Sequence, residues 1–281
     1  MDADRIPTGT TTLAAVIGHP VRHSRSPVIA AAAFQSARAD WTMVALDVEA
    51  RAGAEAVRAV RTLHLGGLMV TMPHKSDVIA ALDGLTPAAQ ALGAVNSIAW
   101  EGDQLVGDNT DGAGLVDSLS ADQGFDPRGH RCVVVGAGGA ARSIVWALAD
   151  AGASEVVVLN RTAERAEIAA ALAGDRGRVG SVESVGDADL VVNATSVGMG
   201  ADPGSDTPVP FDTSVLRAGQ IVVDAVYQPL ETPLLRAAAE MGAIPVDGVG
   251  MLVHQAARTI RRWIGTEPDI AAMNEAARTT L

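Results

Sequence analysis

The hydrophobic positions of the chain fall into short β-branched runs that alternate with longer alanine-rich stretches. The first kind predicts buried strands and the second predicts helices, a pattern typical of an α/β fold with a mainly parallel sheet. The first strands are expected over residues 14–17, 43–48 and 68–70. Residues 95–100 and 104–106 predict an antiparallel hairpin at the edge of that sheet.

A second series of strands and helices begins at Arg131, after a polar stretch over residues 120–130 that contains Gly124, Pro127 and Gly129. The strands expected in it cover residues 132–135, 155–159, 190–192, 221–224 and 244–246. Such a succession predicts a Rossmann-like unit. Further helices are expected over residues 251–264, which Gly265 can cap, and over residues 268–279.

The length of 281 residues suggests two domains. We expect residues 1–112 to form an N-terminal α/β domain, to which residues 249–281 return as C-terminal helices. Residues 113–248 are expected to form the Rossmann domain.

Charge and apolar content exclude several classes of protein. The 21 Lys and Arg residues are outnumbered by 33 Asp and Glu, so the net charge of −12 disfavours binding to nucleic acid or anionic lipid. The longest apolar runs, such as Val28–Phe34, are far shorter than the roughly 20 residues that span a membrane. Because Met1–Arg5 lacks the pattern of a secretory signal, we expect a soluble, cytoplasmic protein.

Cys132 is the one cysteine of the chain, which excludes an internal disulfide and a cysteine-rich metal site. It lies in an apolar run, where we expect it to be buried. No cluster of metal-binding histidines accompanies it, so no metal is expected.

A glycine-rich turn follows the first strand of the second series and opens a helix. It reads Gly136, Ala137, Gly138, Gly139, Ala140, Ala141 and Arg142, which matches the G-x-G-x-x-A fingerprint. In that context the first glycine permits a tight turn, and the second lets the backbone approach a pyrophosphate at the helix N-terminus. The alternative is that the glycines only close a turn between strand and helix.

The end of the next strand indicates which dinucleotide is bound. Asn160 stands where an NAD site usually carries Asp or Glu for the ribose diol, and Arg161 and Arg165 can bind a 2′-phosphate. NADP is therefore preferred over NAD. The alternative is a solvated helix start with Thr162 as its N-cap.

Four polar segments end elements of the first half, at the places where open α/β sheets bind ligands. They are residues 23–27, 70–75, 93–97 and 107–112. Ser26 before Pro27 predicts a helix N-cap, a lone lysine such as Lys75 is usually a surface charge, and Asx-turns can explain much of the last segment.

Together the four segments supply one amine, carboxylates, hydroxyls and amides, a set that suits a polyhydroxylated organic acid. Reduction of a ketone needs a hydride on one side of the carbonyl and a proton donor near its oxygen. A lysine held by an aspartate can supply that proton.

These residues resemble the shikimate dehydrogenase family from about Val16 to the last helix. The segments that carry the resemblance are residues 18–27 (GHPVRHSRSP), 70–75 (VTMPHK), 93–96 (GAVN), 108–111 (DNTD), 136–142 (GAGGAAR), 160–162 (NRT), 193–199 (NATSVGM), 224–227 (DAVY), 229–234 (PLETPL) and 248–255 (GVGMLVHQ). Their number and order make coincidence implausible.

The resemblance implies an NADP-linked, reversible reduction of 3-dehydroshikimate to shikimate, a step of chorismate and aromatic amino-acid biosynthesis. By position, Lys75 and Asp111 match the catalytic pair of the family. The positions that match its substrate-binding residues are Ser24, Ser26, Thr71, Asn96, Asp111 and Gln255, with Tyr227 near both ligands. The positions that match its cofactor site are Gly136–Arg142, Asn160, Arg161, Thr162, Arg165, Thr195, Gly248 and Met251.

Three departures from the family pattern bear on the substrate. Met69 replaces a frequent Asn, Ala30 and Ala31 replace a frequent His-Asn pair, and Ser97 replaces a common Thr. Two alternatives stay open: a paralogue that acts on quinate or on an amino analogue of dehydroshikimate, and a non-catalytic regulatory protein that senses NADP. Intact Lys75 and Asp111 argue against the sensor, and a homodimer is a family-level expectation.

Overall fold

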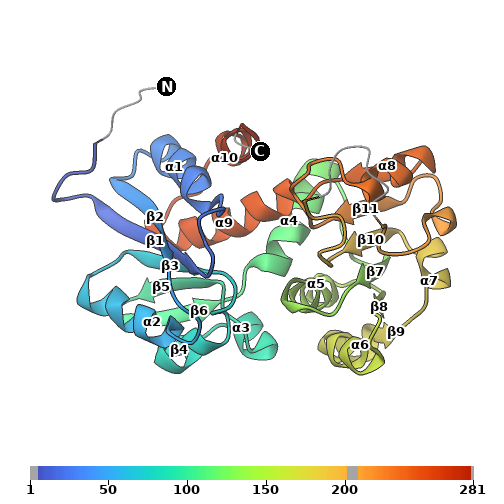
Figure 1. Cartoon of the computed structure of the whole chain (residues 1–281), viewed down its shortest axis with the longest axis horizontal. Helices are drawn as coiled ribbons and strands as arrows, with labels where there is room; N and C mark the ends of the chain where they lie inside the picture. The colour runs from blue at the N-terminus through green and yellow to red at the C-terminus, as the bar shows by residue number, and fades with distance from the viewer. Residues whose placement is uncertain (1–5, 201–207, 280–281) are drawn as a thin grey trace. The chain divides into compact units, whose positions relative to one another are not determined.

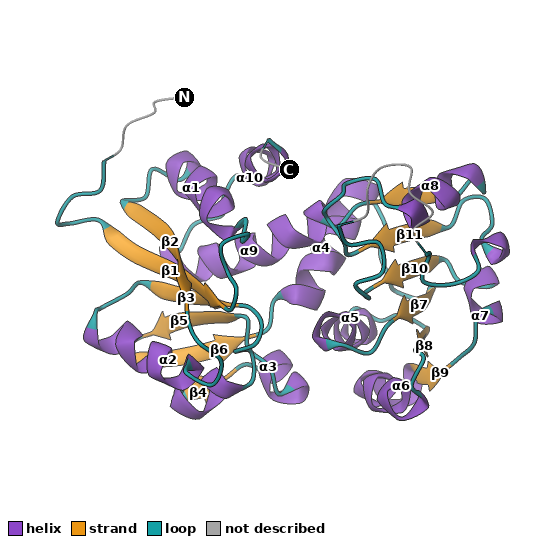
Figure 2. Cartoon of the chain, in the orientation of Figure 1, coloured by secondary structure: helices purple, strands orange, loops and turns teal. Residues whose placement is uncertain are grey.

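The computed structural model describes residues 6–200 and 208–279 (Figure 1). The described residues divide into two compact units, one made of residues 6–110 and 256–279, the other made of the described part of Asp111–Gln255. Each unit holds its own six-stranded sheet and its own helices (Figure 2). The predicted α/β class is confirmed.

The first sheet has the strand order β2-β1-β3-β5-β6-β4. Its parallel strands are β1 (Thr12–Gly18), β2 (Trp41–Asp47) and β3 (Gly67–Val70), and its hairpin joins β5 (Ser97–Glu101) to β6 (Gln104–Asp108). The prediction that this hairpin lies at the edge of the sheet is wrong, because β4 (Gly84–Leu85) pairs beyond β6. Two residues are too few to carry a strand pattern.

Helices cover the first sheet on both faces. The helices of this unit are α1 (Ser26–Ser36), α2 (Gly53–Thr62), α3 (Pro87–Leu92) and α10 (Ile270–Arg278), with the short 3₁₀ helix η1 (Asp77–Ala81). One core joins Ile17 of β1 and Leu68 of β3 to Val57 of α2. Helix α10 packs against α1, which brings the C-terminus of the chain back to the first unit.

Helix α9 (Val249–Ile264) reaches the first unit through Trp263. The indole Nε1 of Trp263 donates a hydrogen bond to the carbonyl oxygen of Ile98 at 2.9 Å. A Cβ at Gly67 would lie 2.1 Å from that nitrogen, so only glycine fits beneath the indole. The predicted return of the C-terminal helices to the first domain is therefore confirmed.

The second sheet is parallel throughout and has the order β12-β11-β10-β7-β8-β9, the order of a Rossmann unit. Its strands are β7 (Arg131–Val135), β8 (Glu155–Leu159), β9 (Gly177–Val179), β10 (Leu190–Asn193), β11 (Ile221–Asp224) and β12 (Ile244–Val246). Alternate residues of β7 enter two different cores, Cys132 and Val134 on one face and Val133 and Val135 on the other. Because the central strands β7, β8, β10 and β11 are buried on both faces, each carries an uninterrupted apolar run.

The first helix of the second unit precedes β7, and the others lie between the strands in the sequence. They are α4 (Asp111–Gln123), α5 (Gly139–Asp150), α6 (Ala163–Ala170), α7 (Glu183–Gly186) and α8 (Pro233–Glu240), with two 3₁₀ helices, η2 (Ala171–Arg176) and η3 (Thr213–Val215). Cys132 is buried as expected, and burial raises the pKa of its thiol to about 12. None of the helices in the described ranges combines the length and the apolar character needed to span a membrane.

Two helix ends test the predicted caps. Gly265 ends α9 with φ +73°, and its N–H donates to the carbonyl oxygen of Arg261 at 2.9 Å, as predicted. The prediction for Ser26 is wrong, because α1 begins at Ser26 itself and Arg25 before it already has helical dihedral angles. The hydroxyl of Ser24 accepts the N–H of Ser26 at 3.3 Å instead.

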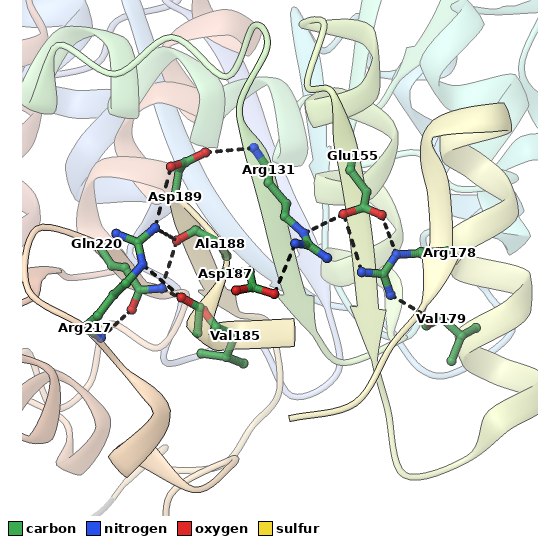
Figure 3. Close-up of polar contacts among 11 residues, drawn as sticks. Arg131, Glu155, Arg178, Val179, Val185, Asp187, Ala188, Asp189, Arg217 and Gln220 are labelled. Atoms are coloured by element: carbon green, nitrogen blue, oxygen red, sulfur yellow. Dashed lines mark hydrogen bonds and ion pairs between the residues drawn. The ribbon is translucent and has the colours of Figure 1, made fainter. Parts of the chain in front are cut away.

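Charged side chains form a network at the amino end of the second sheet (Figure 3). Arg131 at the start of β7 lies 2.5 Å from the carboxylate of Glu155 and 3.3 Å from that of Asp187. Arg178 of β9 also pairs with Glu155. Asp189 accepts the backbone N–H of Arg131 at 3.0 Å, so the network ties the starts of several strands together.

Candidate cofactor and substrate sites

A pocket of about 730 Å³ lies in the second unit, at the carboxyl ends of β7, β8 and β10. The strand order reverses between β7 and β10, and ligands of open α/β sheets bind at such a switch point. Six residues of the predicted cofactor site line the pocket: Gly136, Asn160, Arg161, Thr162, Arg165 and Thr195.

The glycine turn has the geometry that the fingerprint predicts. Gly136 has φ +116°, and a Cβ there would lie 3.1 Å from the carbonyl oxygen of Ala194. A Cβ at Gly138 or Gly139 would meet no heavy atom within 4 Å in the described chain, so packing there does not require glycine at either position. The fully buried Ala141 packs in the core, as the third small position of the fingerprint should.

Helix α5 begins at this turn and suits an anion. The backbone of Gly138 at the N-cap is extended, and within the described chain no side chain caps the helix start. The first N–H groups of a helix have no partner inside the helix, so they can bind a phosphate. Ala137, Ala140 and Arg142 lie on the same turn, around the helix start.

Two arginines after β8 give the pocket a cationic side. Arg161 and Arg165 are exposed, and neither forms an ion pair with a carboxylate in the ranges that the structure describes. Asn160 donates from Nδ2 to the carbonyl oxygen of Thr162 at 2.9 Å, and the Thr162 hydroxyl makes no cap bond to α6. The side-chain cap of the predicted alternative is therefore missing among the described residues, whereas the two exposed arginines agree with its solvated helix start.

One carboxylate, Asp212, also lines the pocket. Its Oδ1 accepts the backbone N–H of Ser214 at 3.0 Å, and hydrogen bonds from Ser214 lower the pKa of Asp212. This carboxylate is therefore already engaged as the cap of η3.

Two residues of the predicted cofactor set lie outside both the glycine turn and the pocket lining. A Cβ at Gly248 would lie 2.5 Å from the carbonyl oxygen of Ala225, so close packing requires glycine there. Met251 is 9% exposed and belongs to the hydrophobic core. Sequence reasoning in turn missed Gly180, Ser181, Val182, Ser196, Val197, Pro210, Phe211 and Asp212 on the pocket wall. Recognition of the three-residue strand β9 would have pointed to Ser181, which follows it in the sequence.

In the first unit, the predicted substrate-binding residues lie at one end of the strands, the carboxyl end of β1 and β3. The carboxyl ends of the parallel strands β1 and β3 lead to Ser24 and Thr71 respectively. The Thr71 N–H donates to the carbonyl oxygen of Ile17 at 2.9 Å, and the N–H of His19 donates to that of Met72 at 2.9 Å. The loops after the two strands are therefore bound to each other.

Lys75 and Asn96 lie at the same end of the sheet, next to the carboxyl end of β3. The Lys75 carbonyl oxygen accepts the N–H of Val95 at 2.6 Å, and the Asn96 carbonyl oxygen accepts that of Val70 at 2.8 Å. The Lys75 side chain is half-buried. The fully buried His74 beside it donates from Nε2 to the carbonyl oxygen of Val48 at 2.7 Å, which anchors the turn that carries the lysine.

The segment after β6 is held by Asn96. Oδ1 of Asn96 accepts the N–H of Thr110 at 2.8 Å, and Nδ2 donates to the Thr110 hydroxyl at 3.0 Å. Asp108 accepts the N–H of the next residue, Asn109, at 2.7 Å. Asp111 follows directly as the first residue of α4.

The predicted substrate and catalytic residues divide between the two units. Ser24, Ser26, Thr71, Lys75 and Asn96 belong to the first, and Asp111, Tyr227 and Gln255 belong to the second. Gln255 donates from Nε2 to the carbonyl oxygen of Leu252 at 2.9 Å.

Two of the departures from the family pattern are neighbours. Met69 of β3 pairs directly with Ser97 of β5, and both are buried. The Ser97 hydroxyl has no hydrogen-bond partner within the described residues. Ala30 is buried in α1, whereas Ala31 is exposed.

Three family models match the chain in order. The substrate binding domain of shikimate dehydrogenase matches residues 16–98, shikimate / quinate 5-dehydrogenase matches residues 120–198, and the C-terminal domain of shikimate 5′-dehydrogenase matches residues 248–278. The chain belongs to the shikimate dehydrogenase family. The resemblance stated from the motifs is thereby confirmed.

Individual members of the shikimate dehydrogenase family align over nearly the whole chain. The shikimate dehydrogenase (NADP(+)) of Moorella thermoacetica is 43% identical over 282 residues, which cover 96% of this chain and 93% of that protein. The crystal structure of shikimate 5-dehydrogenase from Thermus thermophilus in complex with NADP(H) and shikimate is 37% identical with a TM-score of 0.87, and covers 96% of this chain and 100% of that one. The ligand-free 5-ketofructose reductase of Gluconobacter sp. strain CHM43 is 32% identical with a TM-score of 0.89, over 98% and 100% of the two chains.

Proposed function

We propose that this protein is an NADP-dependent shikimate dehydrogenase, an oxidoreductase that reversibly reduces 3-dehydroshikimate to shikimate in chorismate and aromatic amino-acid biosynthesis. The observation that carries the proposal is the 43% identity to a shikimate dehydrogenase (NADP(+)) across 96% of the chain. The pocket with its two exposed arginines and the lysine-bearing turn, as described above, agree with that activity.

The second unit, in this proposal, binds NADP. The turn Gly136–Arg142 and the start of α5 bind the pyrophosphate, and Arg161 and Arg165 with Asn160 bind the 2′-phosphate. Thr162 and Thr195 complete the pocket, and we retain Gly248 and Met251 as cofactor residues. When bound, NADPH supplies the hydride that reduces the ketone.

The first unit, in the same proposal, binds the substrate. The substrate hydroxyls and carboxylate are held by Ser24, Ser26, Asn96 and Gln255, with Thr71 and Tyr227 as further contacts. Lys75 donates a proton to the carbonyl oxygen during reduction and removes it in the reverse direction. Asp111 binds a substrate hydroxyl and orients the Lys75 ammonium.

We assign the substrate-binding domain to residues 1–112 with 249–281 and the NADP domain to residues 113–248. The homodimer expected for the family and the cytoplasmic location expected from the sequence remain predictions. Quinate and amino analogues of dehydroshikimate are the alternative substrates. A change of substrate is compatible with this fold, since a relative with a TM-score of 0.89 is named 5-ketofructose reductase.

A panel of substrates and cofactors tests this function. Purified protein is mixed with NADPH and 3-dehydroshikimate, and NADPH absorbance is followed beside assays with NADH in place of NADPH and with quinate plus NADP. We expect rapid oxidation of NADPH, weak oxidation of NADH and slow use of quinate. Faster turnover of quinate would reassign the substrate, and NADPH binding without turnover of any acid would support the regulatory sensor.

A further inference from the structure

Three polar side chains form a fully buried cluster in the second unit, at the carboxyl ends of β10 and β11. Asn193 and Asp224 end the two strands, pair in register, and are 0% exposed, as is Thr232 before α8. The predicted site contains none of the three. Buried polar groups are costly unless they are hydrogen-bonded, so their bonds identify what they hold.

The carboxylate of Asp224 joins three segments. Its Oδ1 accepts the Nδ2–H of Asn193 at 2.9 Å and the backbone N–H of Val226 at 3.1 Å. Its Oδ2 accepts the hydroxyl of Thr232 at 2.7 Å, and that hydroxyl oxygen caps α8 by accepting the N–H of Leu235 at 3.3 Å. Within the described residues no cation pairs with this carboxylate, and burial raises its pKa.

Asn193 continues the connection to the wall of the cofactor pocket. Its Oδ1 accepts the N–H of Thr195 at 3.1 Å and the Thr195 hydroxyl at 2.7 Å. The Thr195 hydroxyl oxygen accepts the N–H of Val197 at 3.2 Å. Residues 195–197 line the pocket, and a Cβ at Gly136 would lie 3.1 Å from the Thr195 methyl group.

We propose that Asp224 is a positioning residue for cofactor binding: through Asn193 it fixes the pocket wall at residues 195–197, and through Val226 it fixes the backbone next to Tyr227. Its loss weakens the binding of NADPH and leaves the chemical step intact. The inference rests on the proposed function only in taking this pocket as the NADP site.

Gln220 provides a matched control at the other end of the same strand (Figure 3). It is also 0% exposed, and its Nε2 donates to the carbonyl oxygens of Val185 at 2.7 Å and Ala188 at 2.8 Å. It does not line the pocket. Gln220→Ala therefore removes a buried, hydrogen-bonded side chain next to β11, as Asp224→Ala does, but leaves the pocket wall at residues 195–197 unchanged.

The experiment measures NADPH affinity by fluorescence and KM and kcat by absorbance, together with thermal unfolding, in the full-length protein. Asp224→Ala is expected to raise Kd and KM for NADPH about tenfold or more, with kcat at saturating NADPH within about twofold of wild type. Asp224→Asn can still accept from Asn193 and Val226, and should restore most of the affinity. Gln220→Ala should lower the unfolding temperature while NADPH affinity stays at the wild-type level.

If Asp224→Ala does not fold, Asn193→Ala tests the same connection from its other end and should weaken NADPH binding in the same way. Wild-type NADPH affinity in the alanine variants, or an equal loss in Gln220→Ala, would overturn the inference. A wild-type protein that binds NADPH but does not reduce 3-dehydroshikimate would contradict the proposed substrate alone, and the comparison of affinities would still decide the role of Asp224. A wild-type protein that does not bind NADPH would overturn both.

Discussion

Gly136 and Gly138 are two residues apart, but the physical reason for glycine differs between the two positions. At Gly136 the positive φ and the carbonyl oxygen of Ala194 at 3.1 Å from a Cβ make glycine a requirement of the fold. At Gly138 φ is −77° and a Cβ would meet no heavy atom of the described chain within 4 Å. Space for a ligand is then the remaining physical reason for glycine at the second position.

Alanine at these two positions should separate stability from cofactor binding. We expect Gly138→Ala to leave the unfolding temperature unchanged and to raise the Kd for NADPH about tenfold, equivalent to about 1.4 kcal/mol. Gly136→Ala should lower both stability, by about 1–2 kcal/mol, and affinity, because an alanine there is held in a strained backbone conformation. Thermal unfolding and NADPH titration check both variants, and unchanged affinity in Gly138→Ala would contradict the pyrophosphate role of the turn.

The environment of a single residue could be predicted from the sequence where it depends on neighbouring residues in the chain. The burial of Cys132 and the φ of Gly265 follow from nearest neighbours in the chain, and both are confirmed. The cap predicted at Ser26 failed because the helical conformation already includes Arg25, which no local pattern signals. The buried cluster around Asp224 joins residues from three segments and has no local signature.

At the scale of elements, ion pairs between side chains link β7, β8 and β9 at the amino end of the second sheet. Arg131 lies between the carboxylates of Glu155 and Asp187, and Arg178 shares Glu155. The hydrogen bond from Arg178 chiefly lowers the pKa of Glu155, and the backbone hydrogen bond from Arg131 chiefly lowers that of Asp189. These pairs hold the amino end of the sheet, opposite the carboxyl ends that line the pocket.

This network should make stability depend on pH in one direction. Because the folded-state pKa values of Glu155 and Asp189 are depressed, their contribution is present above the unfolded pKa of about 4 and is lost as pH falls through the folded values. We expect the free energy of unfolding to fall below about pH 4. Glu155→Gln should cost about 1 kcal/mol at neutral pH and flatten that fall.

Denaturant unfolding at several pH values measures both effects. Glu167→Gln serves as the control, since Glu167 is exposed on α6 and forms no ion pair in the described parts of the chain. If the two variants lost stability in parallel across the pH range, the network would not be the source of the dependence.

Strands could be predicted where they are long and apolar. The runs in β7, β8 and β11 are buried on both faces, so their composition alone marks them. Strands β4 and β9 have two and three residues and are set by pairing with β6 and β8, which composition does not reveal. That is why the hairpin was misplaced at the edge and why Ser181 was missed on the pocket wall.

At the scale of the whole molecule, the chain passes between the units twice, after Thr110 and after Gln255. The lysine-bearing turn belongs to one unit and the cofactor pocket to the other. The motif of the lysine-bearing turn and that of the glycine turn are each local to one unit, so the sequence alone could suggest a role for each unit.

Hydrogen exchange should therefore report each ligand in its own unit. NADPH is expected to slow exchange in the peptides that follow β7, β8 and β10, and shikimate should slow it at residues 71–75 and 94–97. Mass spectrometry of the two binary complexes checks this, with the unliganded protein as reference. Protection by shikimate confined to the second unit would contradict the assignment of the substrate domain.

The most direct test of the proposed chemistry compares wild type with Lys75→Ala in turnover of 3-dehydroshikimate by NADPH, with the binding of NADPH and of shikimate measured for both proteins. We predict that kcat falls by about two to four orders of magnitude while both dissociation constants stay within about threefold, because the lysine gives its proton only as the carbonyl is reduced. Turnover by Lys75→Ala at the wild-type rate would contradict the role of Lys75 as the proton donor.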